Sequence, residues 1–127
     1  MAESAAATAF TNWLEKQCEF LRHLEKTAVD EASANGNSVR YRELMLQKAL
    51  FLEALGEGAA PYLEGLPPDI AGQAEERFAR FQKSARQAMA CNSPWYMSAL
   101  LYPDDHKPGQ PNDLEAFHQH VCSLCGR

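Results

Sequence analysis

Hydrophobic residues recur at helical spacing from Phe10 to about Ala34. Charged side chains occupy the other side of this stretch, and neither Gly nor Pro interrupts it. The following Asn35-Gly36-Asn37 favours a helix end, because Gly and Asn tolerate the left-handed backbone that closes helices. The pattern therefore predicts a long amphipathic helix over residues 10–34. Its apolar face comprises Phe10, Trp13, Leu14, Phe20, Leu21, Leu24 and Ala28.

A second helix is predicted from Ser38, a good N-cap residue, to about Leu55. Gly56 and Gly58 are expected to end it, with residues 59–66 as a linker or a short extra turn. At 100° per residue, the apolar residues fall on two sides of this helix. The main stripe is Tyr41, Leu44, Met45, Phe51, Leu52 and Leu55, whereas Leu46 and Leu50 lie nearly opposite.

A third helix is predicted from Asp69 to about Asn92, because Pro67 and Pro68 suit a first helical turn. Ser93-Pro94 repeats the cap-and-proline signal before the short apolar segment 95–102. The proline-rich segment 103–111 is expected to be a loop. Asn112 with Glu115 resembles a capping box that opens a last short helix to Cys122 or beyond.

These patterns predict an all-α protein, since no alternating strand pattern occurs. We expect an antiparallel helical bundle of three main helices, plus one or two short C-terminal helices. Residues 1–102 form the predicted bundle. Residues 103–127 are predicted to be a loop and a short C-terminal helix with a Cys/His cluster, which folding does not require.

Composition narrows the class of protein. The chain has 127 residues, 46 % of them hydrophobic and 23 % charged, which fits one folded domain. Its net charge of −5 and its scattered basic residues argue against nucleic acid. No apolar run is long enough for a membrane span, and the amino terminus has no basic signal region. We expect a cytoplasmic protein whose four cysteines remain thiols or bind metal.

The C-terminal segment carries the richest local chemistry. On a helix, His118, Cys122 and Cys125 share one face at spacings i, i+4 and i+7, which suits a zinc ion. A fourth ligand could be His106, Cys91 or Cys18. Alternatively, the two tail cysteines cover apolar surface as small hydrophobic residues. Zinc content after purification without added metal distinguishes these two interpretations.

Motifs for catalysis are incomplete. Ser93 and Ser98 lack the flanking glycines of a nucleophile elbow, and no glycine-rich phosphate loop occurs. Glu115-Ala-Phe-His118 is a single copy of a motif that di-iron bundles need twice. A redox role for Cys122 and Cys125 is disfavoured at the carboxyl end of a helix, where the dipole opposes a thiolate. The sequence therefore favours a non-enzymatic function without a cofactor.

The apolar residues outside the expected core suggest binding instead. Six of them are candidates for a surface that holds an amphipathic helix of another protein, or a second copy of the chain. Alternatively, segment 95–102 simply covers the outer leucines of the second helix. The candidate residues are Leu46, Leu50, Trp95, Tyr96, Leu100 and Leu101.

A family resemblance agrees with this interpretation. The first helix and its Asn-Gly break are followed by Tyr41-Arg-Glu-Leu-Met-Leu-Gln-Lys-Ala-Leu-Phe-Leu-Glu-Ala-Leu55. Over about residues 10–101, this layout resembles small bacterial flagellar export chaperones. The resemblance implies that the protein grips the amphipathic terminal helix of a filament-cap or hook-junction subunit and keeps that subunit competent for export. A small zinc-binding regulatory or structural protein is the alternative.

Overall fold

The computed structural model describes residues 2–125, and the side chains from residue 5 onward. Within this range the chain is 79 % helical and contains no strand, which confirms the all-α prediction. None of the helices in this range is both long enough and apolar enough to cross a bilayer. The five helices are α1 (Ala2–Ser33), α2 (Ser38–Leu63), α3 (Pro68–Ala90), α4 (Pro94–Ala99) and α5 (Asp113–Leu124).

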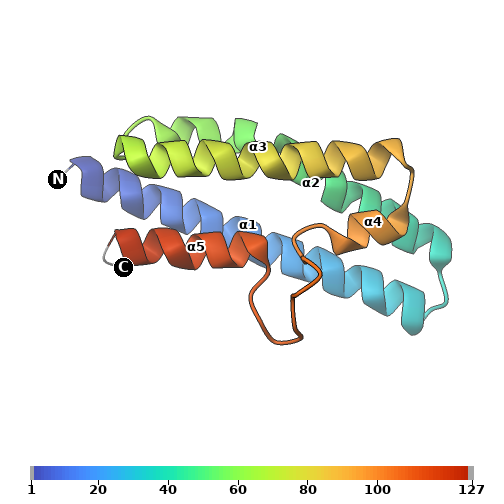
Figure 1. Ribbon diagram of the computed structural model, residues 1–127. Coiled ribbons are helices and arrows are strands. Elements are labelled where there is room, and N and C mark those ends of the chain that lie inside the picture. Colours follow the sequence, from blue (N-terminus) through green and yellow to red (C-terminus); the bar gives the residue numbers. More distant parts are fainter. Residues whose placement is uncertain (1, 126–127) are drawn as a thin grey trace.

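Helices α1, α2 and α3 pack as consecutive antiparallel neighbours (Figure 1). The short connections between them favour this arrangement, because a turn of a few residues returns the chain beside the preceding helix. Helix α5 lies along the amino-terminal half of α1, and α4 packs near the opposite end of the bundle against α2 and α3. The segment between α4 and α5 projects as a loop.

The sequence placed the end of α2 too early. The helix continues through Gly56, Gly58 and Pro61 to Leu63. A β-carbon on Gly58 would lie 3.5 Å from the Trp13 ring, an ordinary contact distance, so this part of α2 packs against Trp13 of α1. Burial of Ala59 on the same helix adds to this packing, which outweighs the poor helix propensity of Gly and Pro.

The predicted caps are mostly correct. Ser93 caps α4, and Asn112 and Glu115 form the expected capping box of α5. The cap of α2 lies one residue earlier than predicted, because the Asn37 side chain accepts a hydrogen bond of 3.0 Å from the Arg40 N–H.

Residues 103–125 pack more closely against the bundle than the sequence suggested. Leu114, Phe117 and Val121 of α5 are buried in the same core as the first three helices. The Phe117 ring meets Phe78 of α3 edge to face, with 5.8 Å between the ring centroids. Removal of this segment would expose the apolar surface under α5, so we expect it to destabilise the bundle, in contrast to the prediction that folding does not require residues 103–127.

We expect Phe117→Ala to lower the free energy of unfolding by about 3–5 kcal/mol, the usual cost of deleting a buried aromatic ring. Urea denaturation measures this loss. Gln119→Ala, at an exposed position on the same helix, is the matched control and should change stability by less than about 0.5 kcal/mol. Equal stability of the two variants would show that α5 is not part of the core.

Candidate functional site

A charged side chain lies inside the core of the bundle. Lys48 of α2 is only 1 % exposed and occupies the buried stripe with Leu44 and Leu52. Its Nζ lies 2.9 Å from Glu25 Oε2 and donates a 2.9 Å hydrogen bond to the Ser98 carbonyl. A buried ammonium requires such partners, because leaving it unpaired in the core is very costly.

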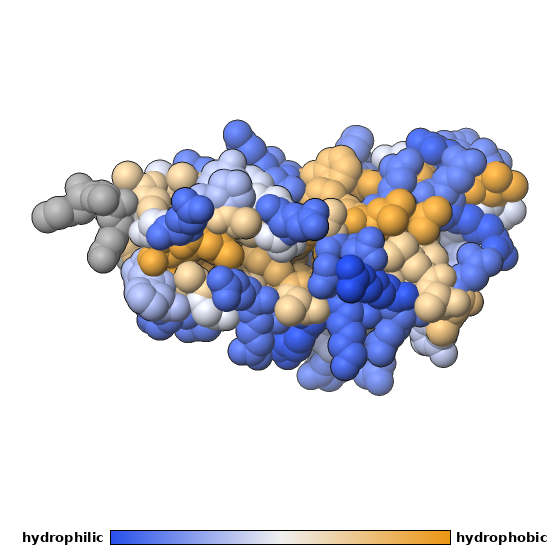
Figure 2. Space-filling model, turned by 90° about the horizontal axis from the view of Figure 1, so that it is seen from above, coloured by the Kyte–Doolittle hydropathy of each residue, from blue (hydrophilic) through white to orange (hydrophobic). Residues whose placement is uncertain are grey.

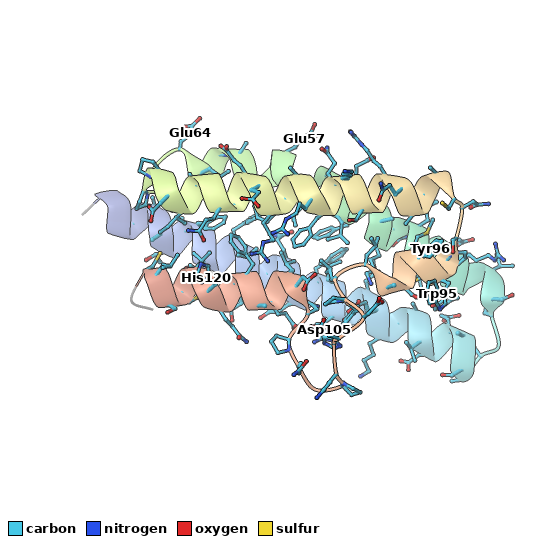
Figure 3. The ribbon with its side chains drawn as sticks, viewed as in Figure 1. Glu57, Glu64, Trp95, Tyr96, Asp105 and His120 are labelled. Carbon is cyan, nitrogen blue, oxygen red and sulfur yellow. The ribbon has the colours of Figure 1, made fainter. Side chains whose placement is uncertain are left out.

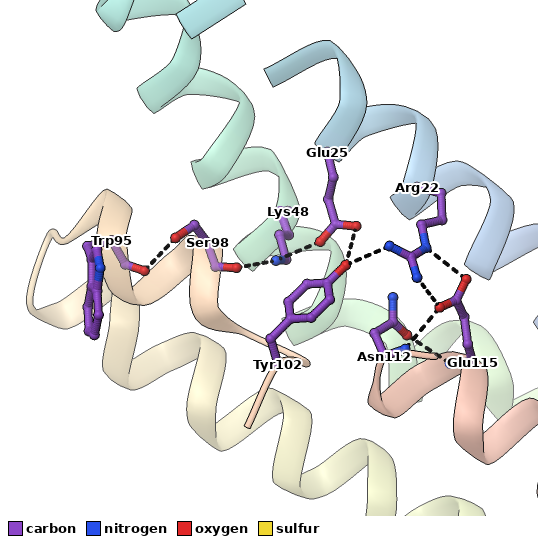
Figure 4. Close-up of polar contacts among 8 residues, drawn as sticks. All are labelled: Arg22, Glu25, Lys48, Trp95, Ser98, Tyr102, Asn112 and Glu115. Atoms are coloured by element: carbon purple, nitrogen blue, oxygen red, sulfur yellow. Dashed lines mark hydrogen bonds and ion pairs between the residues drawn. The ribbon is translucent and has the colours of Figure 1, made fainter. Parts of the chain in front are cut away.

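The network continues through Tyr102, which follows α4 (Figure 4). The Tyr102 hydroxyl donates to Glu25 Oε1 at 2.8 Å and accepts from Arg22 Nη1 at 3.1 Å. The Tyr102 ring also lies beside the lysine, with Lys48 Nζ 5.0 Å from its centroid. The contacts of Lys48 and Tyr102 thus hold α4 and the segment that follows it against both α1 and α2.

Arg22 extends the network to α5. Its guanidinium forms a two-bond pair with Glu115, with Nε–Oε2 at 2.8 Å and Nη2–Oε1 at 2.6 Å. Glu115 Oε1 also accepts the Asn112 N–H of the capping box at 2.9 Å. The Glu115 carboxylate therefore caps the first turn of α5 and also binds this helix to α1.

Burial and pairing set the protonation of this network. Burial lowers the pKa of Lys48, and the nearby Glu25 carboxylate opposes that change. Burial raises the pKa of the Tyr102 hydroxyl to about 12. Burial also opposes ionisation of Glu115, but the hydrogen bonds from Arg22 and Asn112 outweigh it and lower the pKa of this carboxyl. Lys48, Tyr102 and Glu115 are thus each paired with other groups of the network, which is typical of a structural role.

The chain reverses direction directly after α4. Leu101 has φ 76°, a left-handed conformation that is strained for a leucine. Its carbonyl accepts the Asp113 N–H at 2.9 Å, so the turn is held against the start of α5. This turn directs Tyr102 towards α1 and brings both Leu100 and Leu101 into the buried core.

A hollow of about 650 Å³ lies between α3, α4 and the start of α5. We call it the α3–α4 pocket. Apolar side chains make up much of its lining, and Tyr96 and Cys91 contribute exposed side chains to it. Its apolar lining residues include Ala88, Ala99, Leu100, Leu101 and Pro103.

Two aromatic residues of α4 stand beside this pocket. Trp95 is 70 % exposed and Tyr96 is 52 % exposed, and their rings contact edge to face with 5.1 Å between centroids. Both lie at the end of the molecule where α3 passes into α4 (Figure 3). Exposed Trp and Tyr are the residues most often found to dominate protein-binding energy.

The structure separates the predicted binding residues into two groups. Tyr96, Leu100 and Leu101 line the α3–α4 pocket, whereas Leu46 and Leu50 do not. Leu100 and Leu101 are largely buried and belong to the core as well as to the pocket wall, so their predicted contribution to partner binding stays a prediction. Leu46 and Leu50 lie outside the core as predicted, with 43 % and 47 % of their surface exposed, and α4 does not cover them.

The predicted zinc ligands of the tail are only partly brought together. Cys122 Sγ lies 3.5 Å from His118 Nε2, and Cys125 is half-buried against the core. Among residues 2–125, no three His, Cys, Asp or Glu side chains gather as a group that could hold a metal ion. A zinc site of the predicted kind would therefore need ligands beyond the Cys122–His118 pair.

The three residues considered as a fourth ligand lie in different surroundings. Cys18 is buried in α1 and borders a hollow that His118 also lines. Burial raises the pKa of this thiol to about 12, which disfavours the thiolate that zinc needs. His106 contacts Tyr102 and the Gln110 carbonyl, and Cys91 lines the α3–α4 pocket.

Comparisons of this chain with protein-family models, with curated proteins and with solved structures found no match.

We expect Glu25→Gln to destabilise the protein by about 3–5 kcal/mol, because it leaves the buried Lys48 charge without its counter-charge. The double variant Glu25→Gln with Lys48→Met should regain much of that loss, since the unpaired charge is removed as well. Chemical denaturation measures both. Glu43→Gln is the control: it breaks the exposed Arg40–Glu43 pair and should cost under about 0.5 kcal/mol. A double variant less stable than Glu25→Gln would contradict this role of the pair.

The Arg22–Glu115 pair should make stability depend on acid pH. Because the folded pKa of Glu115 lies below its ordinary value of 4.5, its stabilising effect is present above that value and is lost as the pH falls through the folded pKa. We expect Glu115→Gln to cost about 1 kcal/mol at neutral pH, since the pair is partly exposed. In urea titrations, the stabilities of wild type and variant should converge as the pH falls below the folded pKa of Glu115. A difference that stays constant with pH would refute the ionic contribution.

Proposed function

We propose that this protein is a non-catalytic protein-binding protein that holds an amphipathic helix of a partner at the α3–α4 pocket. The observation that carries the proposal is the exposed Trp95–Tyr96 pair beside a hollow with a largely apolar lining. An apolar side chain of the partner would enter the pocket, while the aromatic rings cover the adjacent turn of its helix. Helices bind grooves in this way through anchors at i, i+3, i+4 and i+7.

The size of the pocket and the contacts that hold its wall support this role. Its volume of about 650 Å³ falls within the range of roughly 300–1,000 Å³ that is usual for small-ligand pockets, so it can take an apolar side chain of a partner. The Lys48 hydrogen bond to the Ser98 carbonyl holds α4, and the contacts of Tyr102 hold the segment that follows. A wall that is ordered before binding loses less conformational freedom when the partner arrives.

The resemblance to flagellar export chaperones suggests the identity of the partner. In that case the bound helix is the amphipathic terminal helix of a filament-cap or hook-junction subunit, and the complex forms in the cytoplasm before export. The apolar lining of the pocket and the exposed Trp95 fit the apolar face of such a helix. Neither nucleic acid nor a membrane is required for this role.

Peptides that correspond to those terminal helices test the proposal by isothermal titration calorimetry. We expect Trp95→Ala to weaken binding by tenfold or more, about 1.4 kcal/mol, as for a buried aromatic anchor. Ala99→Leu should weaken it as well, because the added side chain occupies part of the pocket.

Phe20→Ala is the matched control, since Phe20 is an exposed aromatic residue that contacts Phe51 and does not line the pocket. The affinity of the Phe20→Ala variant for the peptide should equal that of the wild type. Binding that is unaffected by Trp95→Ala and by Ala99→Leu would exclude the pocket as the site. The absence of binding to any such peptide would count against the export-chaperone role.

A further inference from the structure

An apolar stripe lies on the outer side of α2, separate from the α3–α4 pocket. It consists of Val39, Leu46 and Leu50, which are 66 %, 43 % and 47 % exposed. At 100° per residue these three side chains lie within about 40° of one another around the helix. Figure 2, which views the molecule from the side on which α2 and α3 lie in Figure 1, shows hydrophobic residues interspersed with charged ones over the face in view. We call the three residues the α2 stripe.

The charges beside the α2 stripe are divided along the helix. Arg40 and Arg42 lie near its amino-terminal end, and Glu53 and Glu57 lie beyond Leu50 towards its carboxyl end. Glu57 points outward from the bundle in Figure 3. Measured around the helix from Leu44, on the buried side, Arg42 and Glu53 lie at about 160° and 180°. Both therefore border the same edge of the stripe, next to Leu46.

This arrangement is complementary to itself under a half-turn. The point midway between Leu46 and Leu50 is also close to midway between Arg42 and Glu53. If a second α2 packs antiparallel with its twofold axis at that point, Leu46 faces Leu50 of the other copy. The same operation brings Arg42 beside Glu53 of the other copy. A twofold interface requires this kind of self-complementary surface.

The local ion pairs permit the contact. Glu53 already holds Arg86 of α3 through one oxygen, with Nε–Oε2 at 3.0 Å, and a carboxylate can accept further hydrogen bonds. Glu43, which is next to Arg42 in the sequence, is paired with Arg40 at 3.1 Å. Among the described residues, Arg42 has no ion pair of its own, so its guanidinium is available for another chain.

We propose that the α2 stripe binds a second copy of this chain, as an antiparallel α2–α2 contact with twofold symmetry. The interface is small, because in this register only Leu46 and Leu50 of each copy meet apolar side chains, which is few against the roughly 20–30 residues per side of a stable interface. We therefore expect weak self-association at high protein concentration. The contact does not depend on the proposed function, since the α3–α4 pocket lies elsewhere.

Sedimentation equilibrium over a concentration series from about 10 µM to 1 mM tests the proposal on the full chain. The average mass of the wild type should rise towards that of a dimer, and Leu46→Glu with Leu50→Glu should remain monomeric. Because both leucines are exposed, this double variant should keep the helical circular dichroism of the wild type. A wild type that stays monomeric throughout would overturn the proposal.

Charge variants test the antiparallel register. Arg42→Glu should weaken self-association, because it places like charges beside Glu53 of the other copy, whereas Arg42→Lys should largely retain it. Glu64→Gln, at an exposed acid beyond the stripe, is the control and should leave the association unchanged. Equal self-association of Arg42→Glu and the wild type would contradict this register. Association that survives the double leucine change would show that the α2 stripe is not the interface.

Discussion

The buried ion pair between Lys48 and Glu25 is the constraint on which the arrangement of the carboxyl-terminal half depends. The lysine lies in the apolar stripe of α2, so α1 must present Glu25 and α4 must present the Ser98 carbonyl to it. Burial alone would drive the lysine towards its neutral form. These partners fix where α4 lies, and with it one wall of the α3–α4 pocket.

Apolar packing supplies the scaffold around this pair. Helices α1, α2 and α3 form the main layers, and α5 completes the core with Phe117 against Phe78. The two-bond contact of Arg22 with Glu115 fastens α5 at its first turn. A chain of polar contacts from Lys48 through Glu25, Tyr102 and Arg22 to Glu115 therefore links the position of α4 to that of α5.

Much of the scaffold is predictable from the sequence, because the helices follow the period of the apolar residues. Predictions from local sequence rules were wrong where contacts between residues far apart in the chain determine the structure. Packing of Gly58 against Trp13 extends α2 beyond its expected end. The spacing of Leu114, Phe117 and Val121 was itself a signal that α5 has an apolar face. Lys48 was also visible as a charge within an apolar stripe, but its partners are far away in the chain.

The candidate site was only partly predictable for the same reason. The exposed Trp95–Tyr96 pair and the outer leucines of α2 follow from local patterns. The pocket cannot be predicted from local patterns, because three segments of the chain form it and Leu101, in a left-handed conformation, shapes its wall. Burial of Leu100 and Leu101 is a consequence of that turn, which no nearby Gly or Asn indicates.

The central claim is that the Lys48 network holds α4 as a prepared surface for a partner helix. Nuclear magnetic resonance of the labelled protein during titration with a terminal-helix peptide tests this claim directly. The two tryptophans give separate indole N–H signals, and Trp13 serves as an internal reference because it is stacked against Tyr62. We expect the Trp95 signal to shift with added peptide while the Trp13 signal stays in place. A peptide that binds and leaves the Trp95 signal unmoved would contradict this claim.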